Sequence, residues 1–406
     1  MHRRFALQWA TAAIAALSIG IGAAQAETLK IWSFGEQDNY TEAMVKEFQA
    51  KNPDLTIEVR RVAFSDVNDE ALRAIRSGTG PDIMPIDNPN VAFFAAKKAL
   101  LELDDMVKQS KVIYADKIFP GPRLNSSWKG KLVGIPRGAN TIALYINDDM
   151  FREAGLDPDK PPRTWAELHD AAAKLNNPAK NIYGFAFSAR GNEEGTFQFL
   201  PYIQSTGADW DKLNSPGAIR AVEFWQKLLD EKLASRDTLN RGQSDSTATF
   251  VNGNAAMVVS GPWEIPGIDK NAKFKWRVAL LPGEKADSPR TSALGEQSYV
   301  IPKTAANPKA AFRFLEYVIS QQGRNWNDFG ILPATSDAVS KDPKWPQAYQ
   351  AFAEQMKYAR PRGPNPEWPQ ISKAISGAMQ QVLTHQSDAK TAMAAAAALV
   401  QRVSKN

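Results

Sequence analysis

The segment TLKIWSFGEQDNYTEAMVKEFQAKNPDLTIEVR, residues 28–60, contains three structural signals in succession. Its opening part, TLKIWSF, is mostly apolar and predicts a strand. Met44 and Phe48 then fall on one face of a helix, which Pro53 ends. The closing LTIEVR alternates apolar with polar side chains, as a strand with one exposed face does. A strand, a helix and a strand at this spacing predict a βαβ unit, and therefore an α/β fold with parallel strands.

The same alternation of strands and helices continues along the chain. ALYIN at 143–147 and YGFAF at 183–187 predict strands, and Ser215 can cap a helix over 216–229. Thr164 opens a capping-box pattern at the start of another helix. The length of the chain, 406 residues, favours two domains over one.

The first 26 residues have the order of a secretory signal peptide. Arg3 and Arg4 precede an apolar run that ends in Ala-Gln-Ala at 24–26, so we expect cleavage before Glu27. This run is too short for a membrane span, and no comparable run follows it. The sequence has no cysteine to carry a lipid at the cleavage site or to form disulfides. We therefore expect a free, soluble protein of the periplasm, stabilised by its core alone.

Composition argues against several other classes of protein. The formal net charge is +5, and Lys and Arg are interspersed with Asp and Glu, so we expect no nucleic-acid partner. Without cysteine there is no thiol nucleophile, and the mature chain has only His169 and His385, both expected at the surface. Neither GxSxG nor HExxH occurs, so we expect no catalytic residue, no metal and no cofactor. A secreted glycoside hydrolase remains an alternative, although no pattern pairs two carboxylates.

Six blocks of sequence together carry a family resemblance. They are GTGPDI (78–83), GKLVGIPRGANTIALYINDDMFREAGLD (130–157), TWAEL (164–168), FVNGNAAMVVSGPW (250–263), GEQSYVIPKTAANPKAAFRFLEYV (295–318) and GILPA (330–334). In this order they resemble the bacterial extracellular solute-binding proteins of carbohydrate ABC importers, the group that includes maltose-binding protein. The resemblance covers essentially the whole mature chain.

The resemblance implies a two-lobed periplasmic binding protein fold, in which each lobe is a mainly parallel sheet flanked by helices. It implies a first lobe built from residues 27–138 and 283–328 and a second lobe built from 139–282 and 329–406. A small carbohydrate or carbohydrate-derived ligand would lie in the cleft at the hinge, and closure of the lobes would signal loading. The implied partners are the transmembrane subunits of an ABC permease, and the protein is expected to be a monomer.

Trp263 ends the block FVNGNAAMVVSGPW, in which Met257 to Val259 predict a short buried strand. In the family the corresponding tryptophan stacks on a sugar ring, so the resemblance implies this role for Trp263. Covering about 60 Å² of apolar surface at about 25 cal/mol per Å² contributes roughly 1.5 kcal/mol. The alternative is a core position beneath a loop.

The resemblance places the other expected ligand contacts in short separate segments. They are Glu36 and Gln37; Asp87 and Asn88; Arg137 and Asn140; Glu194, Thr196 and Phe197; Gly295, Glu296 and Gln297; and Arg362. Carboxylates and amides suit sugar hydroxyls, and Gly295 would allow a close approach of backbone to ligand. Arg362 can hold an anionic group such as a uronate, sulfonate or phosphate, or it can bond loop carbonyls. An anionic glycoside or polyol derivative therefore stays open, whereas the arginines disfavour a polyamine. Trp368 is expected to pack against the following helix.

Overall fold

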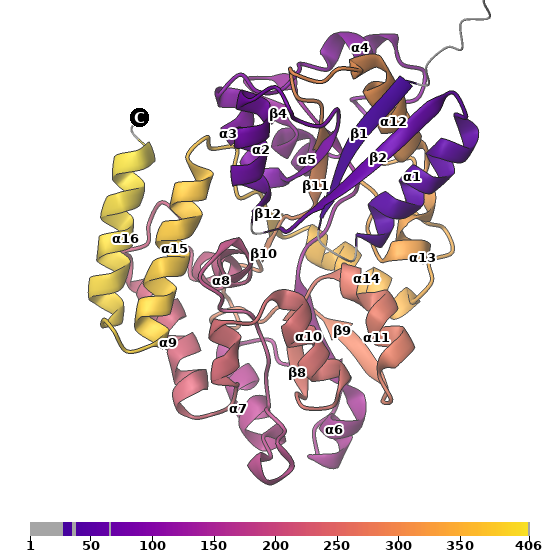
Figure 1. The fold of residues 1–406 in the computed structure, drawn as a ribbon. Helices are drawn as coiled ribbons and strands as arrows, with labels where there is room; N and C mark the ends of the chain where they lie inside the picture. Colours follow the sequence, from indigo (N-terminus) through magenta and orange to yellow (C-terminus); the bar gives the residue numbers. More distant parts are fainter. Residues whose placement is uncertain (1–26, 35–37, 65, 405–406) are drawn as a thin grey trace, which may run out of the picture.

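The computed structural model describes residues 27–34, 38–64 and 66–404, which fold into two lobes with helices packed around small sheets (Figure 1). The predicted signal peptide and the expected ligand contacts Glu36 and Gln37 lie outside the described residues. The mixture of helices and strands confirms the predicted α/β class and the two-lobed fold.

The first lobe begins with the predicted βαβ unit. β1 (Glu27–Phe34) pairs in parallel with β2 (Leu55–Val62), and α1 (Asn39–Lys51) connects them. β3 (Met84–Asp87) lies beside β1, whose Ile31 forms a parallel bridge with Ile83. β11 (Gln297–Val300) runs antiparallel between β3 and β6 (Ile135–Pro136). Asp87 is thereby placed opposite Gln297 at the end of the sheet.

In the sheet of the second lobe, the central strand runs antiparallel to its two neighbours. β7 (Ala143–Asn147) lies between β8 (Met257–Ser260) and β9 (Trp276–Ala279) and runs opposite to both. β8 and β9 both run opposite to β7, so they share one direction. In the first lobe β1, β2 and β3 also share one direction, and β11 runs against β3 and β6. The expectation of mainly parallel sheets is therefore confirmed, with β7 and β11 as the reversed strands. The predicted strand 183–187 is no regular strand. Tyr183 forms a parallel bridge with Ala255, just before β8, and Ala186 forms one with Val258 of β8.

Helices cover both lobes. Those around the first sheets are α2 (Val67–Arg76), α3 (Val91–Ala96), α4 (Asp104–Gln109), α5 (Pro120–Asn125) and α12 (Pro308–Ser320). The others are α6 (Asp148–Glu153), α7 (Trp165–Leu175), α8 (Glu193–Ser205), α9 (Pro216–Asp230), α10 (Gln243–Val251), α11 (Ile265–Asn271), α13 (Asn325–Phe329), α14 (Pro346–Met356), α15 (Trp368–Leu383) and α16 (Ala389–Ser404). Among the described residues, none of these helices is both long enough and apolar enough to cross a membrane.

Local sequence signals account for where several helices begin. The Thr164 hydroxyl accepts a hydrogen bond from the backbone N–H of Glu167, and Ser215 caps α9 through the N–H of Ala218. Trp225 of α9 is fully buried among aromatic rings of the second lobe. Trp368 is also fully buried in this core, which confirms its predicted packing role.

The two lobes meet where the chain crosses between them. Asn140 pairs with Gly295, and Ala139 pairs with Leu332, so crossing segments lie side by side. The lobe boundaries stay predictions, but two contacts favour a return to the first lobe later than residue 283. Gly283 forms a parallel bridge with Thr164 of the second lobe, and β10 (Ser292–Ala293) pairs with β12 (Ala359–Arg360).

Candidate ligand-binding site

Trp263 lies directly after β8, in the short 3-10 helix η4 (Pro262–Glu264). Its ring lies over Gly261, where any side chain would overlap the indole. The Gly261 carbonyl accepts a hydrogen bond from the hydroxyl of Tyr145 at 2.7 Å, which fixes the turn. The indole is half-buried against the core of the second lobe, and its centroid lies 6.4 Å from that of Phe197. Part of the ring therefore stays exposed, as stacking on a solute requires.

Carboxylates lie next to this indole. Glu264 Oε1 accepts hydrogen bonds from the Ser244 hydroxyl at 2.6 Å and from Trp263 Nε1 at 3.1 Å. Burial raises the pKa of the Glu264 carboxyl, and the negative charge of Glu194 acts in the same direction. Glu194 itself accepts a hydrogen bond from the backbone N–H of Gln243 at 3.3 Å. This face of the second lobe is thus aromatic and acidic.

Arg362 joins residues from both lobes. Its guanidinium forms two parallel hydrogen bonds with Asp87, at 2.9 and 3.0 Å, and a third with Asn88 Oδ1 at 3.0 Å. On the other side it bonds Glu193, the first residue of α8. Its Cζ atom lies 4.4 Å from the centroid of the Phe197 ring. Burial raises the pKa of Glu193, against the attraction of Arg362.

Arg137 forms a second cluster at the crossing from β6. It bonds Glu296 and also Asp38, the latter at 3.0 Å, and its guanidinium lies 5.1 Å from the ring centroid of Tyr40. Asn140 Nδ2 donates to Glu296 Oε2 at 2.8 Å. Two neighbouring crossings are therefore tied together by charged hydrogen bonds, which are the stronger kind.

Gly295 permits a close approach, although its partners are protein atoms. A Cβ at this position would overlap Asn140 Oδ1 and would lie 2.8 Å from Cζ of Phe197. The glycine therefore lets the segment before β11, the segment between β6 and β7, and helix α8 meet at one point. Gln297, two residues on, is half-buried in β11 opposite Asp87.

Thr196 lies in α8, and its side chain faces α15. Its hydroxyl donates to the carbonyl of Ser372 and accepts from the Ser372 hydroxyl, both at 3.0 Å. The side chain is fully buried. These bonds favour a packing role for Thr196 over the expected contact with ligand.

Several buried polar atoms near the lobe boundary have no hydrogen-bond partner among the described residues. They are Ser33 Oγ, Asn90 Oδ1, Asn125 Oδ1 and Nδ2, Asn140 Oδ1 and Gln297 Oε1. Ser33 is the next-to-last residue of β1, Asn90 lies shortly after the end of β3, and Asn125 is the last residue of α5. Unpaired buried polar groups cost about 1–3 kcal/mol each, so a polar solute that formed hydrogen bonds with these atoms would remove that cost.

Sequence reasoning missed several residues of these clusters. It chose Glu194 and passed over Glu193, and it did not single out Asp38, Asn90 or Asn125. The signal for Asp38 is its position as N-cap of α1, where it accepts the N–H of Thr41 at 3.1 Å. For Glu193 the only signal is its place in the first turn of a helix, which the adjacent acid shares.

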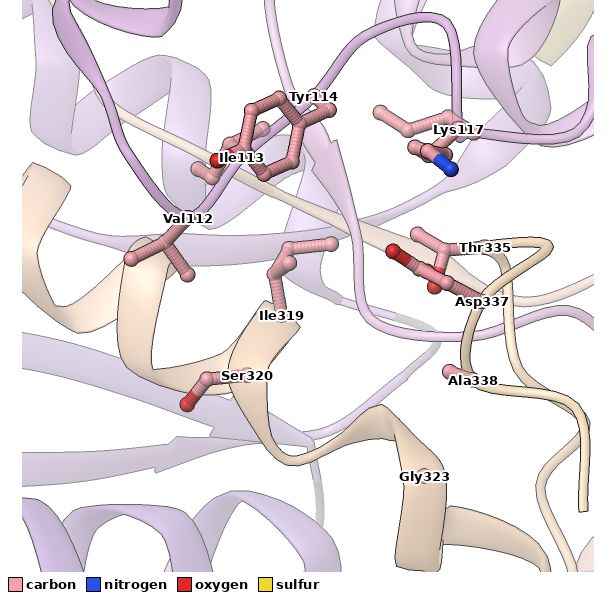
Figure 2. Close-up of a pocket in the computed structure, with 11 residues that line it drawn as sticks. Val112, Ile113, Tyr114, Lys117, Ile319, Ser320, Gly323, Thr335, Asp337 and Ala338 are labelled. Atoms are coloured by element: carbon pink, nitrogen blue, oxygen red, sulfur yellow. The ribbon is translucent and has the colours of Figure 1, made fainter.

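Two cavities of the structure lie apart from these clusters. One, of about 230 Å³, is bordered by the loop around Tyr114, the end of α12 and the loop around Thr335, with Lys117 and Asp337 at one side (Figure 2). The other, of about 600 Å³, lies between β9, α14 and the loop before α7. Neither is lined by any expected ligand contact.

A two-lobed α/β molecule with aromatic and hydrogen-bonding groups gathered where its lobes meet has the architecture of a binding protein that closes on its solute. This chain belongs to the bacterial extracellular solute-binding protein family, whose pattern it matches over residues 32–325. The sn-glycerol-3-phosphate-binding periplasmic protein UgpB of Escherichia coli strain K12 is 28% identical over 352 residues, which are 81% of this chain and 79% of that protein.

Solved structures give the same result. A solute-binding protein of an ABC transporter from Thermotoga lettingae, bound to α-D-tagatose, is 28% identical with a TM-score of 0.82, covering 93% of this chain and 99% of that one. Maltose-bound MalE3 of T. maritima is 24% identical with a TM-score of 0.85, covering 93% and 100%. The second likeness is one of fold alone.

Proposed function

We propose that this protein captures a neutral sugar or sugar derivative between its lobes and delivers it to an ABC importer. The proposal is carried by the buried, unpartnered hydroxyl and amide groups near the lobe boundary, together with the half-exposed indole of Trp263. Hydroxyls on the edge of a sugar both donate and accept, so they can satisfy amide oxygens, amide N–H groups and serine alike. The flat C–H face of the ring suits the indole.

The charges favour a neutral solute over an anionic one. Arg362 already has two carboxylate partners, Asp87 and Glu193. Arg137 likewise has Asp38 and Glu296. An added anion would meet more carboxylates than free cations at either place, and like charges at close range oppose binding.

The second candidate is an anionic glycoside or polyol derivative, bound by the same mechanism. The name of UgpB, a glycerol-3-phosphate-binding protein of 28% identity, supports it. It requires Arg362 or Arg137 to leave a carboxylate for the solute. The tagatose of the T. lettingae protein, at the same identity, supports the neutral ligand.

The remaining parts of the proposal follow from the family and from the sequence. The chain is exported by the segment before Glu27, works unlipidated in the periplasm, and meets the permease as a monomer. It binds its solute without converting it. Incubation with oligosaccharides, followed by an assay for new reducing ends, tests this against a glycoside hydrolase.

Isothermal titration calorimetry of the mature protein tests the choice of ligand. The panel comprises monosaccharides, disaccharides, mannitol, a hexuronate, sn-glycerol 3-phosphate and spermidine. We expect binding of at least one neutral sugar or polyol at micromolar concentration or below. Binding of glycerol phosphate or uronate alone would establish the second candidate, and binding of spermidine alone would overturn both.

A further inference from the structure

Arg362 uses every hydrogen-bond donor that it has. Nε donates to the Leu294 carbonyl at 3.4 Å, Nη1 to Asp87 and Glu193, and Nη2 to Asp87 and Asn88. A guanidinium has five N–H groups, so none is left for a solute. The side chain is 2% exposed. Arg362 is therefore better suited to holding parts of the protein together than to binding an anion.

The partners of Arg362 come from different lobes. Asp87 ends β3 in the first lobe, whereas Glu193 begins α8, which packs in the second lobe. Arg362 itself follows β12 and leads into α15, also of the second lobe. Glu193 is held in turn by Trp368, whose Nε1 donates to Oε2 at 2.9 Å.

We propose that Arg362 is a latch between the lobes: anchored by Glu193 on the second lobe, it grips Asp87 on the first and stabilises the closed arrangement even without solute. Opening must separate Asp87 from Arg362 or Arg362 from Glu193. Either separation breaks charge-assisted hydrogen bonds that are shielded from water. Because only the closed form holds a solute on both sides, the latch sets the affinity through the closed fraction.

This inference rests on the proposed function only in placing the solute between the lobes. A merely structural arginine would change the stability of the protein without changing how often the lobes part. The measurement must therefore report lobe separation in the solute-free protein. The chain has no cysteine, so Glu58→Cys in the first lobe and Asp269→Cys in the second can be labelled specifically for single-molecule energy transfer.

The test variants are Asp87→Asn and Arg362→Lys in this labelled background. The matched control is Asp148→Asn. Asp148 forms a bidentate pair with Arg277 at 2.6 and 2.7 Å, and 7% of its side chain is exposed, against 6% for Asp87. This pair lies within the second lobe, so it does not join the two lobes. We expect a closed fraction in the solute-free parent, reduced about tenfold in both test variants and unchanged in the control. For any solute that binds, we expect about tenfold weaker affinity, mainly through faster dissociation.

Two results would overturn the latch. One is the finding that the lobes of the solute-free parent protein are always separated. That measurement does not depend on whether any variant folds. The other is a closed fraction in Asp87→Asn or Arg362→Lys equal to that of Asp148→Asn. If no sugar or polyol binds, the proposed function fails while the separation of the lobes still reports on the latch.

Discussion

The indole of Trp263 lies over the Cα of Gly261, so close that even a methyl group on that Cα would overlap the ring. The backbone of Gly261 is extended, with φ −102° and ψ 175°, so any residue could adopt it. Position 261 must be a glycine because the aromatic ring occupies the space of a side chain, and the local backbone conformation imposes no such requirement. Position 261 therefore controls where the indole stands.

We predict that Gly261→Ala weakens solute binding at least tenfold, which is about 1.4 kcal/mol. The added methyl group must push the indole out of its position, and the stacking surface moves with it. Calorimetry on Gly261→Ala, Trp263→Ala and the double variant measures the effect. We expect the double variant to lose no more than Trp263→Ala alone, because both changes remove one contact. Full additivity would show that the glycine acts elsewhere.

Trp263→Ala alone should weaken binding at least tenfold while the protein stays folded, since the ring is only half-buried. The matched control is Tyr114→Ala, which removes an aromatic ring that is 50% exposed and borders the separate 230 Å³ cavity. Affinity in the control should not change. Unchanged affinity in Trp263→Ala would return this residue to a packing role.

Much of this fold could be predicted from local patterns. The alternation around Leu55, the spacing of Met44 and Phe48, and the capping residue Ser215 act within one element, where sequence neighbours are also neighbours in space. The segment 183–187 misled the prediction because an apolar run pairs here through two bridges only. Its partner strand is set by distant parts of the chain.

The site could be predicted only in outline. Glu193 and Glu194 are adjacent in the first turn of α8, so they differ by about 100° around the helix axis. Which of them meets Arg362 depends on the path of a loop that lies 169 residues later in the sequence than Glu193. The pairing of Arg362 with Asp87, 275 residues apart, has no local signal either. Long-range contacts of this kind decide which polar residues remain for a solute.

For Thr196 we predict a change of stability without a change of binding. Thr196→Val keeps the shape of the side chain but removes both hydrogen bonds to Ser372 and leaves that carbonyl and hydroxyl without this partner. The free energy of unfolding should fall by about 1–3 kcal/mol, measured by urea denaturation. Thr196→Ser, which keeps the hydroxyl, is the control and should fall less. A loss of affinity in Thr196→Val at unchanged stability would place the hydroxyl on the solute instead.

We predict that the contribution of Glu264 to the stability of the protein depends on pH. Burial raises the pKa of its carboxyl above the ordinary value of 4.5, so the folded protein holds this proton more tightly than the unfolded chain. The stability that this group contributes is complete below pH 4.5 and is lost as the pH rises through the raised pKa. Glu264→Gln imitates the protonated form, and its Oε1 can keep both bonds from Ser244 and Trp263. The variant should therefore gain stability over the parent protein as the pH increases from 4.5 to 8.

The control for this prediction has the opposite sign. Hydrogen bonds from Lys357 and Tyr358 lower the pKa of Glu354, so its contribution is present above pH 4.5 and is lost on acidification. Glu354→Gln should accordingly lose stability relative to the parent as the pH rises towards 4.5, and the difference should stay constant from pH 4.5 to 8. Urea denaturation of all three proteins at several pH values gives both slopes. If Glu264→Gln followed the parent protein at every pH, its carboxylate would be solvated, and the acidic face beside Trp263 would be open to water rather than shielded for a solute.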